Sequence, residues 1–101
     1  MVTLEKLINE FTDTSIQFGE AIKQGDLQES NKQMKKIYEI RKELSLRDST
    51  TEMVRLMNHS DEFVRLKTAY SLLLILPEQS REVFKELSQY GDFWSLGLKK
   101  D

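Results

Sequence analysis

The side chains best suited to catalysis lie together at His59, Ser60 and Asp61, and His59 is the only histidine of the 101 residues. A histidine, a hydroxyl and a carboxylate are the components of a nucleophilic triad, but that chemistry requires the three groups to converge on one point. Three consecutive residues at the start of a helix point in different directions. The segment is therefore interpreted as a turn, in which His59 precedes a helix cap supplied by Ser60 or Asp61.

No catalytic, cofactor or metal site is predicted. The chain has no cysteine and no second histidine, so the ligands that usually hold zinc are lacking. Asp61 and Glu62 lie at the start of a predicted helix. The positive charge at a helix N-terminus explains why carboxylates occur there. The glycines stand singly, so no glycine-rich phosphate loop is present; they are Gly19, Gly25, Gly91 and Gly97.

A basic cluster lies on the helix predicted from residue 27 to residue 44. Its members are Lys32, Lys35, Lys36, Arg41 and Lys42. Such a stripe is typical of phosphate binding, but three glutamates interrupt it, at Glu29, Glu39 and Glu43. Tyr38 is placed on the apolar side of the helix, where it cannot stack on a base. A solvated helix face is therefore favoured, and nucleic-acid binding through these lysines is kept as an alternative.

Composition predicts a single globular domain over residues 1–101. Fifteen basic and seventeen acidic residues leave a net charge of -2, so no global field attracts nucleic acid or anionic lipid. The apolar share of 39% is that of a folded chain, and the longest apolar run, residues 72–76, is too short to cross a bilayer. The acidic N-terminus is unlike a signal peptide, and the lack of cysteine favours a cytoplasmic protein.

Apolar residues recur at helical spacing along the whole chain, and none alternate as in a strand. The first helix is predicted over residues 4–24 and closed by Gly25, whose freedom at positive φ suits a helix end. Asp26 then caps the second helix, with Glu29 completing a capping box. A similar box, Ser49 with Glu52, opens a short third helix that ends at residues 58–60.

The fourth helix is predicted to run from Asp61 to Leu76, because Pro77 forces its predecessor out of helical geometry. Pro77 begins the fifth helix, which continues through Tyr90 to Gly91. A last short helix is expected around Phe93 and Trp94, as a cap on the core or as an exposed anchor. The fourth helix is apolar on all sides after Ala69, which is typical of a central helix or of one whose spare face a partner covers.

A family resemblance rests on residues 53–87. Leu56-Met57, then Asp61, Val64-Arg65, Ala69 and Leu72-Leu73 resemble the core pattern of a HEAT repeat. Where such repeats usually place an aspartate in the turn, this chain has His59, which suits a small curled domain better than a long array. The layout also resembles a family of short bacterial HEAT-like proteins with no assigned activity, which implies a stand-alone bacterial protein.

These observations predict an all-α fold, a right-handed stack of about three helical hairpins with five to six helices. The predicted function is a non-enzymatic protein–protein interaction module of the bacterial cytoplasm. An immunity protein or antitoxin that occludes a toxin is the first alternative, on fold-level analogy, and nucleic-acid binding is the second. The expected partner is another protein of unknown identity, with no membrane and no cofactor, and the sequence leaves the oligomeric state open.

The predicted binding surface lies where the second and fourth helices would stand side by side, as inner helices of successive hairpins. On the second helix it comprises Lys35, Glu39 and Lys42. On the fourth helix, Arg65, Thr68 and Leu72 follow at helical spacing on the side opposite the core. An ion pair of Arg65 with Asp61, one turn away, is the alternative role of that arginine.

Arg65→Glu is therefore expected to weaken binding of the native partner by at least about 2 kcal/mol, as for an interface hot spot. The melting temperature should change only slightly, because an intrahelical ion pair contributes little. Calorimetric titration and thermal unfolding measure the two quantities. Unchanged binding would leave Arg65 a structural residue.

Overall fold

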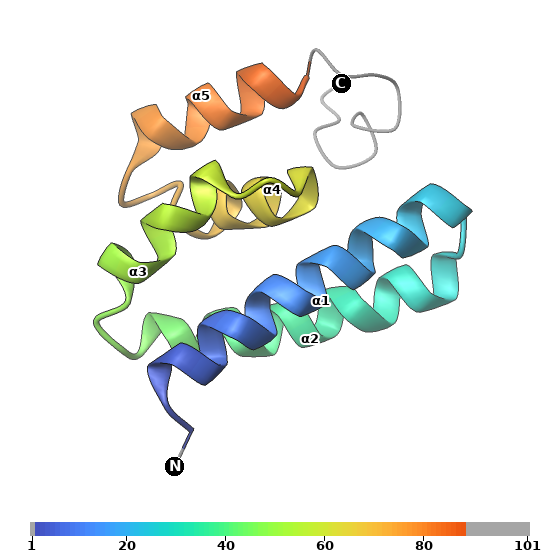
Figure 1. The fold of residues 1–101 in the computed structure, drawn as a ribbon, viewed down its shortest axis with the longest axis horizontal. Helices are drawn as coiled ribbons and strands as arrows, with labels where there is room; N and C mark the ends of the chain where they lie inside the picture. The colour runs from blue at the N-terminus through green and yellow to red at the C-terminus, as the bar shows by residue number, and fades with distance from the viewer. Residues whose placement is uncertain (1, 89–101) are drawn as a thin grey trace.

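The computed structural model describes residues 2–88, and every regular element in that part of the chain is helical (Figure 1). The elements are, in order, α1 (Leu4–Gln24), α2 (Leu27–Ser45), α3 (Thr50–Val54), the 3-10 helix η1 (Arg55–Asn58), α4 (Glu62–Ser71) and α5 (Pro77–Leu87). The prediction of an all-α fold is confirmed over these residues. The helix predicted around Phe93 and Trp94, and the closure of the fifth helix at Gly91, lie outside the described residues.

α1 and α2 form a hairpin whose turn follows from two residues. Gly25 has φ 70°, in the left-handed region, and its N–H bonds to carbonyls of the last turn of α1. The Asp26 carboxylate then accepts from the N–H of Glu29 at 3.0 Å, which begins α2. The predicted boundary between the two helices is confirmed. The return half of the capping box is absent, because the Asp26 N–H donates to the carbonyl of Ala21 at 2.9 Å, while the Glu29 carboxylate accepts from the Gln33 side-chain amide at 2.6 Å.

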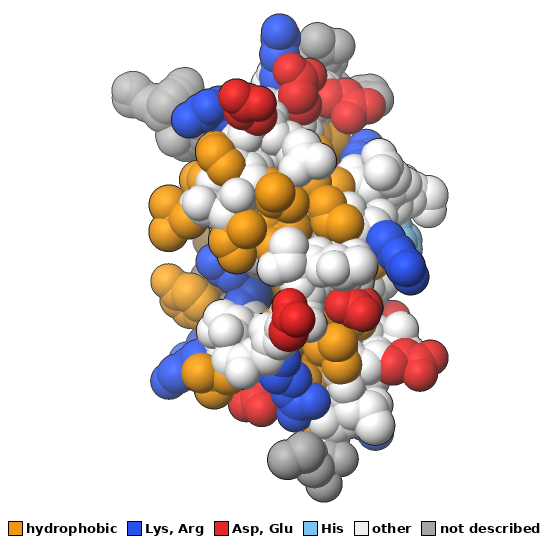
Figure 2. All heavy atoms as spheres, turned by 90° about the vertical axis from the view of Figure 1, so that its left-hand side faces the viewer, with side chains coloured by type: hydrophobic (Ala, Val, Ile, Leu, Met, Phe, Trp, Pro, Cys, Tyr) orange, Lys and Arg blue, Asp and Glu red, His pale blue; other side chains and the backbone are white. Residues whose placement is uncertain are grey.

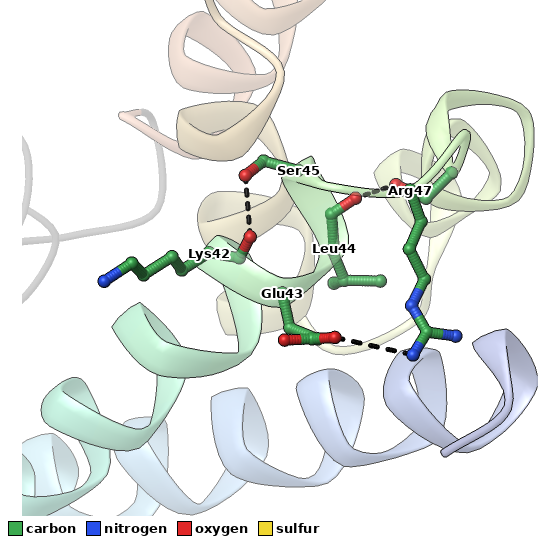
Figure 3. Close-up of polar contacts among 6 residues, drawn as sticks. Lys42, Glu43, Leu44, Ser45 and Arg47 are labelled. Atoms are coloured by element: carbon green, nitrogen blue, oxygen red, sulfur yellow. Dashed lines mark hydrogen bonds and ion pairs between the residues drawn. The ribbon is translucent and has the colours of Figure 1, made fainter. Parts of the chain in front are cut away.

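The start of α3 differs from the prediction. Ser49 occupies the N-cap position but makes no side-chain cap. Its hydroxyl donates instead to the carbonyl of Leu44 at 3.0 Å, which ties the start of α3 to the end of α2 (Figure 3). The predicted capping box with Glu52 is wrong because this hydroxyl serves the preceding helix. Met53 and Met57 are buried on the inner side of this segment.

α4 begins as predicted and ends earlier. Asp61 caps it by accepting from the backbone amides of Phe63 and Val64 at 2.9 and 3.1 Å. The helix ends at Ser71 rather than at Leu76, and residues 72–75 form turns. Pro77 therefore follows a turn rather than a continuous helix.

Two hydroxyl groups near the end of α4 bond back to its own carbonyls. Thr68 donates to Val64 at 2.7 Å and Ser71 donates to Lys67 at 2.8 Å. Such bonds compete with the backbone ladder and bend helices. The turns that follow bury Leu72 and leave Leu74 exposed. One face of a helix could not bury the whole apolar run of residues 72–76. The turns place part of this run in the core and part at the surface.

α4 occupies the middle of the molecule, between α5 and the hairpin of α1 and α2 (Figure 1). The predicted central position of the fourth helix is confirmed. The expectation that the second and fourth helices stand side by side is wrong, because the backbone of α4 packs on α5 and, in the first hairpin, on α1 rather than on α2. α4 reaches α2 through side chains, as where Lys67 meets Met34. The most deeply buried large side chains come from four helices and are Phe11, Ile37, Leu44, Val64, Leu66 and Leu87.

The contact of α4 with α1 depends on a glycine. A Cβ atom added at Gly19 would overlap the ring of Phe63. That ring has little room to move, since it is 3% exposed and packs edge-to-face on Phe18 at a centroid distance of 5.9 Å. Gly19 therefore allows the two helices to approach closely, as glycine does where backbones must meet.

Gly19→Ala is expected to destabilise the domain. Overpacking a rigid site costs about 1–3 kcal/mol, which outweighs the roughly 1 kcal/mol that alanine contributes through helix propensity. Urea unfolding measures the difference, with Gln17→Ala, at an exposed position of the same helix, as the control. A Gly19→Ala protein as stable as wild type would show that the Phe63 ring can move aside.

Candidate protein-binding groove

A cavity of about 610 Å³ lies between the C-terminal half of α2, the segment that leads through α3, and the end of α4. We name it the α2–α4 groove. It is defined by Tyr38, Glu39, Arg41, Lys42, Leu44, Ser45, Arg47, Ser49, Thr50, Met53, Ser71, Leu72 and Ile75. Its lining thus comes from segments that are up to 37 residues apart in the chain, counted from Tyr38 to Ile75.

The floor of the groove is apolar. Leu44, Met53 and Leu72 line it, and each is at most 3% exposed. They come from α2, α3 and the turn after α4, so the floor exists only when these three segments are packed together. A concave apolar floor is the usual starting point of a binding site.

Large apolar side chains also stand on the lip of the groove. Tyr38 is 67% exposed and Ile75 is 59% exposed, and both line the cavity. Two further exposed leucines are adjacent in sequence to groove residues: Leu46 follows Ser45, and Leu74 precedes Ile75. Figure 2 shows apolar side chains gathered on the side of the molecule that carries α3 and the turn between α4 and α5. A gathering of this kind marks an interaction surface more often than isolated exposed residues do.

The polar rim is mainly basic. Of residues 2–88, Arg41, Lys42 and Arg47 line the groove, against a single acidic residue, Glu39. The Arg41 guanidinium lies 5.6 Å from the centroid of the Tyr38 ring, within reach of a cation–π contact. Arg47 turns back to the Glu43 carboxylate at 3.4 Å, a long and partly exposed ion pair (Figure 3).

Three serines of the groove have their hydroxyl protons engaged. Ser45 donates to the Lys42 carbonyl at 2.7 Å, Ser49 to the Leu44 carbonyl, and Ser71 to the Lys67 carbonyl. A nucleophilic serine needs a neighbouring base to take its proton. Here the backbone accepts each proton, so the hydroxyls brace the ends of α2 and α4. Figure 3 shows the bond of Ser45 to the Lys42 carbonyl.

A buried lysine lies between α4 and the hairpin of α1 and α2. Lys67 is 4% exposed, and its ammonium lies 4.1 Å from the centroid of the Phe18 ring and 5.7 Å from that of Tyr70. It also donates to the sulfur of Met34 at 3.4 Å. Within residues 2–88, no carboxylate forms an ion pair with it.

The surroundings of Lys67 disfavour its charge. Burial removes water from the ammonium, and the positive Arg41 adds repulsion; together they lower the pKa of Lys67 from 10.5 to about 8. Desolvation is the larger cause. The neighbouring Tyr70 is affected in the opposite direction, because burial raises the pKa of its hydroxyl.

The structure brings three of the six predicted site residues into the groove. Glu39 and Lys42 line its rim and Leu72 lines its floor. Lys35 is exposed on α2, but it does not line the cavity. Leu72 was expected on the side of its helix opposite the core, and it is instead 3% exposed at the bottom of the cavity.

The other two predicted residues serve the fold. Thr68 is fully buried, so its expected place on an accessible stripe is wrong, because α4 packs on both sides. Arg65 donates to the carbonyl of His59 at 2.6 Å and forms no ion pair with Asp61. Arg65→Glu is therefore expected to lower stability as well as any binding, since it removes this hydrogen bond and places a carboxylate beside a carbonyl.

His59 lies in the turn before α4, where the sequence placed it. Its Nδ1 accepts from the backbone N–H of Asp61 at 3.0 Å, while the Asp61 carboxylate caps the helix. The imidazole and the carboxylate thus both serve the start of α4. Within residues 2–88, no three His, Asp or Glu side chains are grouped to hold a metal ion.

Two features of the site were missed in the sequence. Tyr38 was assigned to the apolar side of its helix, and that placement is wrong: α2 buries Ile37 and leaves Tyr38 at the lip. Lys67 had a readable signal, because Phe63 and Tyr70 lie one turn before and one turn after it. A lysine at that spacing occupies the buried stripe of its helix.

The fold and the groove define a small all-helical domain with an apolar cavity under a basic rim. The chain belongs to the family described as "Domain of unknown function (DUF2019)", whose model matches residues 5–97. No curated protein and no solved structure matches it. None of the described helices is both long enough and apolar enough to cross a membrane.

Lys67→Met is expected to stabilise the domain at pH 7 by about 1–3 kcal/mol, because replacing an unpaired buried charge with an apolar side chain of similar size removes a desolvation penalty. The wild-type protein should also gain about 2 kcal/mol of unfolding free energy between pH 7 and pH 9.5. The folded pKa of about 8 lies below the unfolded value of 10.5, so the unfolded chain binds more protons in this window. The variant should lack this gain.

Urea unfolding at the two pH values measures both effects. The measurements stay below pH 10. Above that pH, tyrosine ionisation in the unfolded chain lowers the free energy of unfolding and so opposes the effect of Lys67. Lys35→Met, at an exposed lysine, is the control and should change stability by less than about 0.5 kcal/mol. A destabilised Lys67→Met protein would show that the contacts with Phe18 and Tyr70 outweigh desolvation.

Proposed function

We propose that this domain is a non-enzymatic protein–protein interaction module, which holds a segment of a partner protein in the α2–α4 groove. One observation carries the proposal: a cavity with an apolar floor lies between exposed large apolar side chains, Tyr38 and Ile75. Fully burying a side chain of this size contributes about 1.5–3 kcal/mol. In the isolated domain these two side chains stay in contact with water. A partner that covers them would be bound more tightly by the free energy of their burial.

The surroundings of the floor match the anatomy of a binding hot spot. Such sites combine an apolar centre with a polar rim that excludes water, and arginine and tyrosine are enriched in them. Arg41 and Tyr38 stand in contact at this rim. Engagement of the three serine hydroxyls with backbone carbonyls further favours binding over nucleophilic chemistry.

A HEAT-like stack of helical hairpins is part of the proposal. α1 pairs with α2, α4 pairs with α5, and α4 packs against the first hairpin through α1. In helical repeats, a hairpin that cannot cover its own apolar face stacks on the next one, and binding surfaces form across successive hairpins. The α2–α4 groove lies where α2 of the first hairpin meets α3 and the turn between α4 and α5.

Ile75→Asp tests the proposal. Ile75 is exposed in a turn, so the substitution should leave the fold intact while placing a charge beside the apolar floor. Proteins from the native cell are captured on immobilised wild type, and binding of the captured protein is then measured by titration. Binding to Ile75→Asp is expected to be at least tenfold weaker, a loss of about 1.4 kcal/mol or more.

Leu27→Asp is the matched control. Leu27 is also an exposed apolar residue, 73% accessible, but it lies at the start of α2 and outside the groove. Its variant should bind like wild type, and both variants should melt like wild type. A partner that distinguishes Leu27→Asp and ignores Ile75→Asp would place the binding surface elsewhere on the domain.

A further inference from the structure

The charge of the groove is opposite to that of the chain. The whole sequence has a net charge of -2, whereas the described part of the chain contributes three basic residues and one acidic residue to the rim. A local field of this sign in a low-dielectric cleft selects an anionic partner and repels a basic one. The side chains concerned are Arg41, Lys42 and Arg47 against Glu39.

Two of the three rim cations lack an acidic partner in the described part of the chain. Arg47 is paired with Glu43, but neither Arg41 nor Lys42 forms an ion pair with a carboxylate of residues 2–88. Contact with the Tyr38 ring holds the Arg41 guanidinium beside the apolar lip. Its planar set of N–H donors matches a carboxylate bidentately. A carboxylate of a bound segment would meet this donor set next to the apolar floor.

The buried Lys67 also favours an anionic partner. Its buried ammonium has no carboxylate partner in residues 2–88, and Arg41 is the charged group that acts on it. Charges separated by low-dielectric material interact more strongly than charges in water. A carboxylate placed on Arg41 would offset the repulsion between the two cations. The rim thus contains unneutralised positive charge that an anion can stabilise.

We infer that the occupant of the α2–α4 groove is an acidic amphipathic helix of the partner, which places an apolar side chain in the cavity above Leu44, Met53 and Leu72 and carboxylates against Arg41 and Lys42. This inference rests on the proposed function and names the chemistry of the partner. A helix is favoured over an extended strand because the described chain offers no sheet edge for backbone pairing. A helix satisfies its own backbone hydrogen bonds and can lie on an apolar floor.

Two other occupants fit the groove less well. A second copy of this chain bound symmetrically would place the same basic rim on both sides of the interface, so like charges would face each other. Single-stranded nucleic acid would match the charge, but it binds by stacking bases on aromatic platforms. Among residues 2–88, Tyr38 is the one aromatic residue that lines the groove, and a single ring offers no series of stacking platforms.

The test is a selection of random 16-residue peptides displayed on phage against the full-length protein, with Ile75→Asp used to remove peptides that bind elsewhere. Recovered peptides are expected to combine aspartate or glutamate with large apolar residues at helical spacing. Their affinity, measured by fluorescence anisotropy, should fall at least tenfold for the double variant Arg41→Glu/Lys42→Glu. It should also fall with rising salt, since the rim is exposed to solvent.

Lys32→Glu/Lys36→Glu is the matched control, because it changes the net charge equally on exposed lysines of the same helix outside the groove. This variant should bind the peptides within twofold of wild type. Basic or neutral peptides, equal binding by Arg41→Glu/Lys42→Glu, or no groove-dependent peptide at all would each overturn the inference. Displacement of the peptides by a single-stranded RNA, or a dimer in sedimentation that Ile75→Asp dissociates, would overturn it as well.

The two proposals fail separately. If Ile75→Asp weakens the native partner while Arg41→Glu/Lys42→Glu does not, the groove binds a protein but not through acidic groups. If neither variant affects the native partner, the groove itself is not the binding surface.

Discussion

The close contact between Phe63 and Gly19 is the constraint on which the arrangement of the domain depends. It holds α4 against α1, and the neighbouring Phe18 ring confines Phe63 to one orientation. Because α4 is fixed there, its C-terminal end lies beside α2, where Leu72 completes the floor of the groove. A packing requirement on one side of the molecule therefore determines the shape of the cavity on another.

The turn after α4 determines how the domain divides its apolar residues. A continuous helix up to Pro77 would present five consecutive apolar residues on all sides, and only part of them could be buried. Ending the helix at Ser71 sends Leu72 inward, while Leu74 and Ile75 stay at the surface with exposures of 95% and 59%. The same local break that relieves the packing problem thus supplies one lip of the groove.

Lys67 shows that the interior is not optimised for stability alone. Its side chain joins three elements, through Phe18 of α1, Met34 of α2 and Tyr70 of α4. An apolar residue could fill the same space without a desolvation penalty. The ammonium of Lys67 lies behind the rim and acts on Arg41. The electrostatic character of the groove therefore arises from buried as well as exposed residues.

Local interactions made much of the fold readable from the sequence. Gly25, Asp26 and Asp61 end or begin helices through bonds to residues at most four positions away, so their roles do not depend on the rest of the chain. The all-helical class follows in the same way from the period of the apolar residues. The groove was not readable, although Glu39 and Lys42 were correctly placed on an exposed face.

What only the tertiary structure decided was which faces meet. Thr68 and Tyr38 each occupy a position that helical spacing alone leaves ambiguous, at the border between an apolar and a polar face. α4 buries Thr68 because it is enclosed on both sides, and α2 exposes Tyr38 because the backbone of α2 packs on α1 and leaves this side chain at the lip of the groove. The sequence by itself determined the helices and their caps, because those depend on contacts within one turn. The choice of packing partners rests on contacts between distant segments, such as Phe63 on Gly19, which leave no periodic signal in the chain.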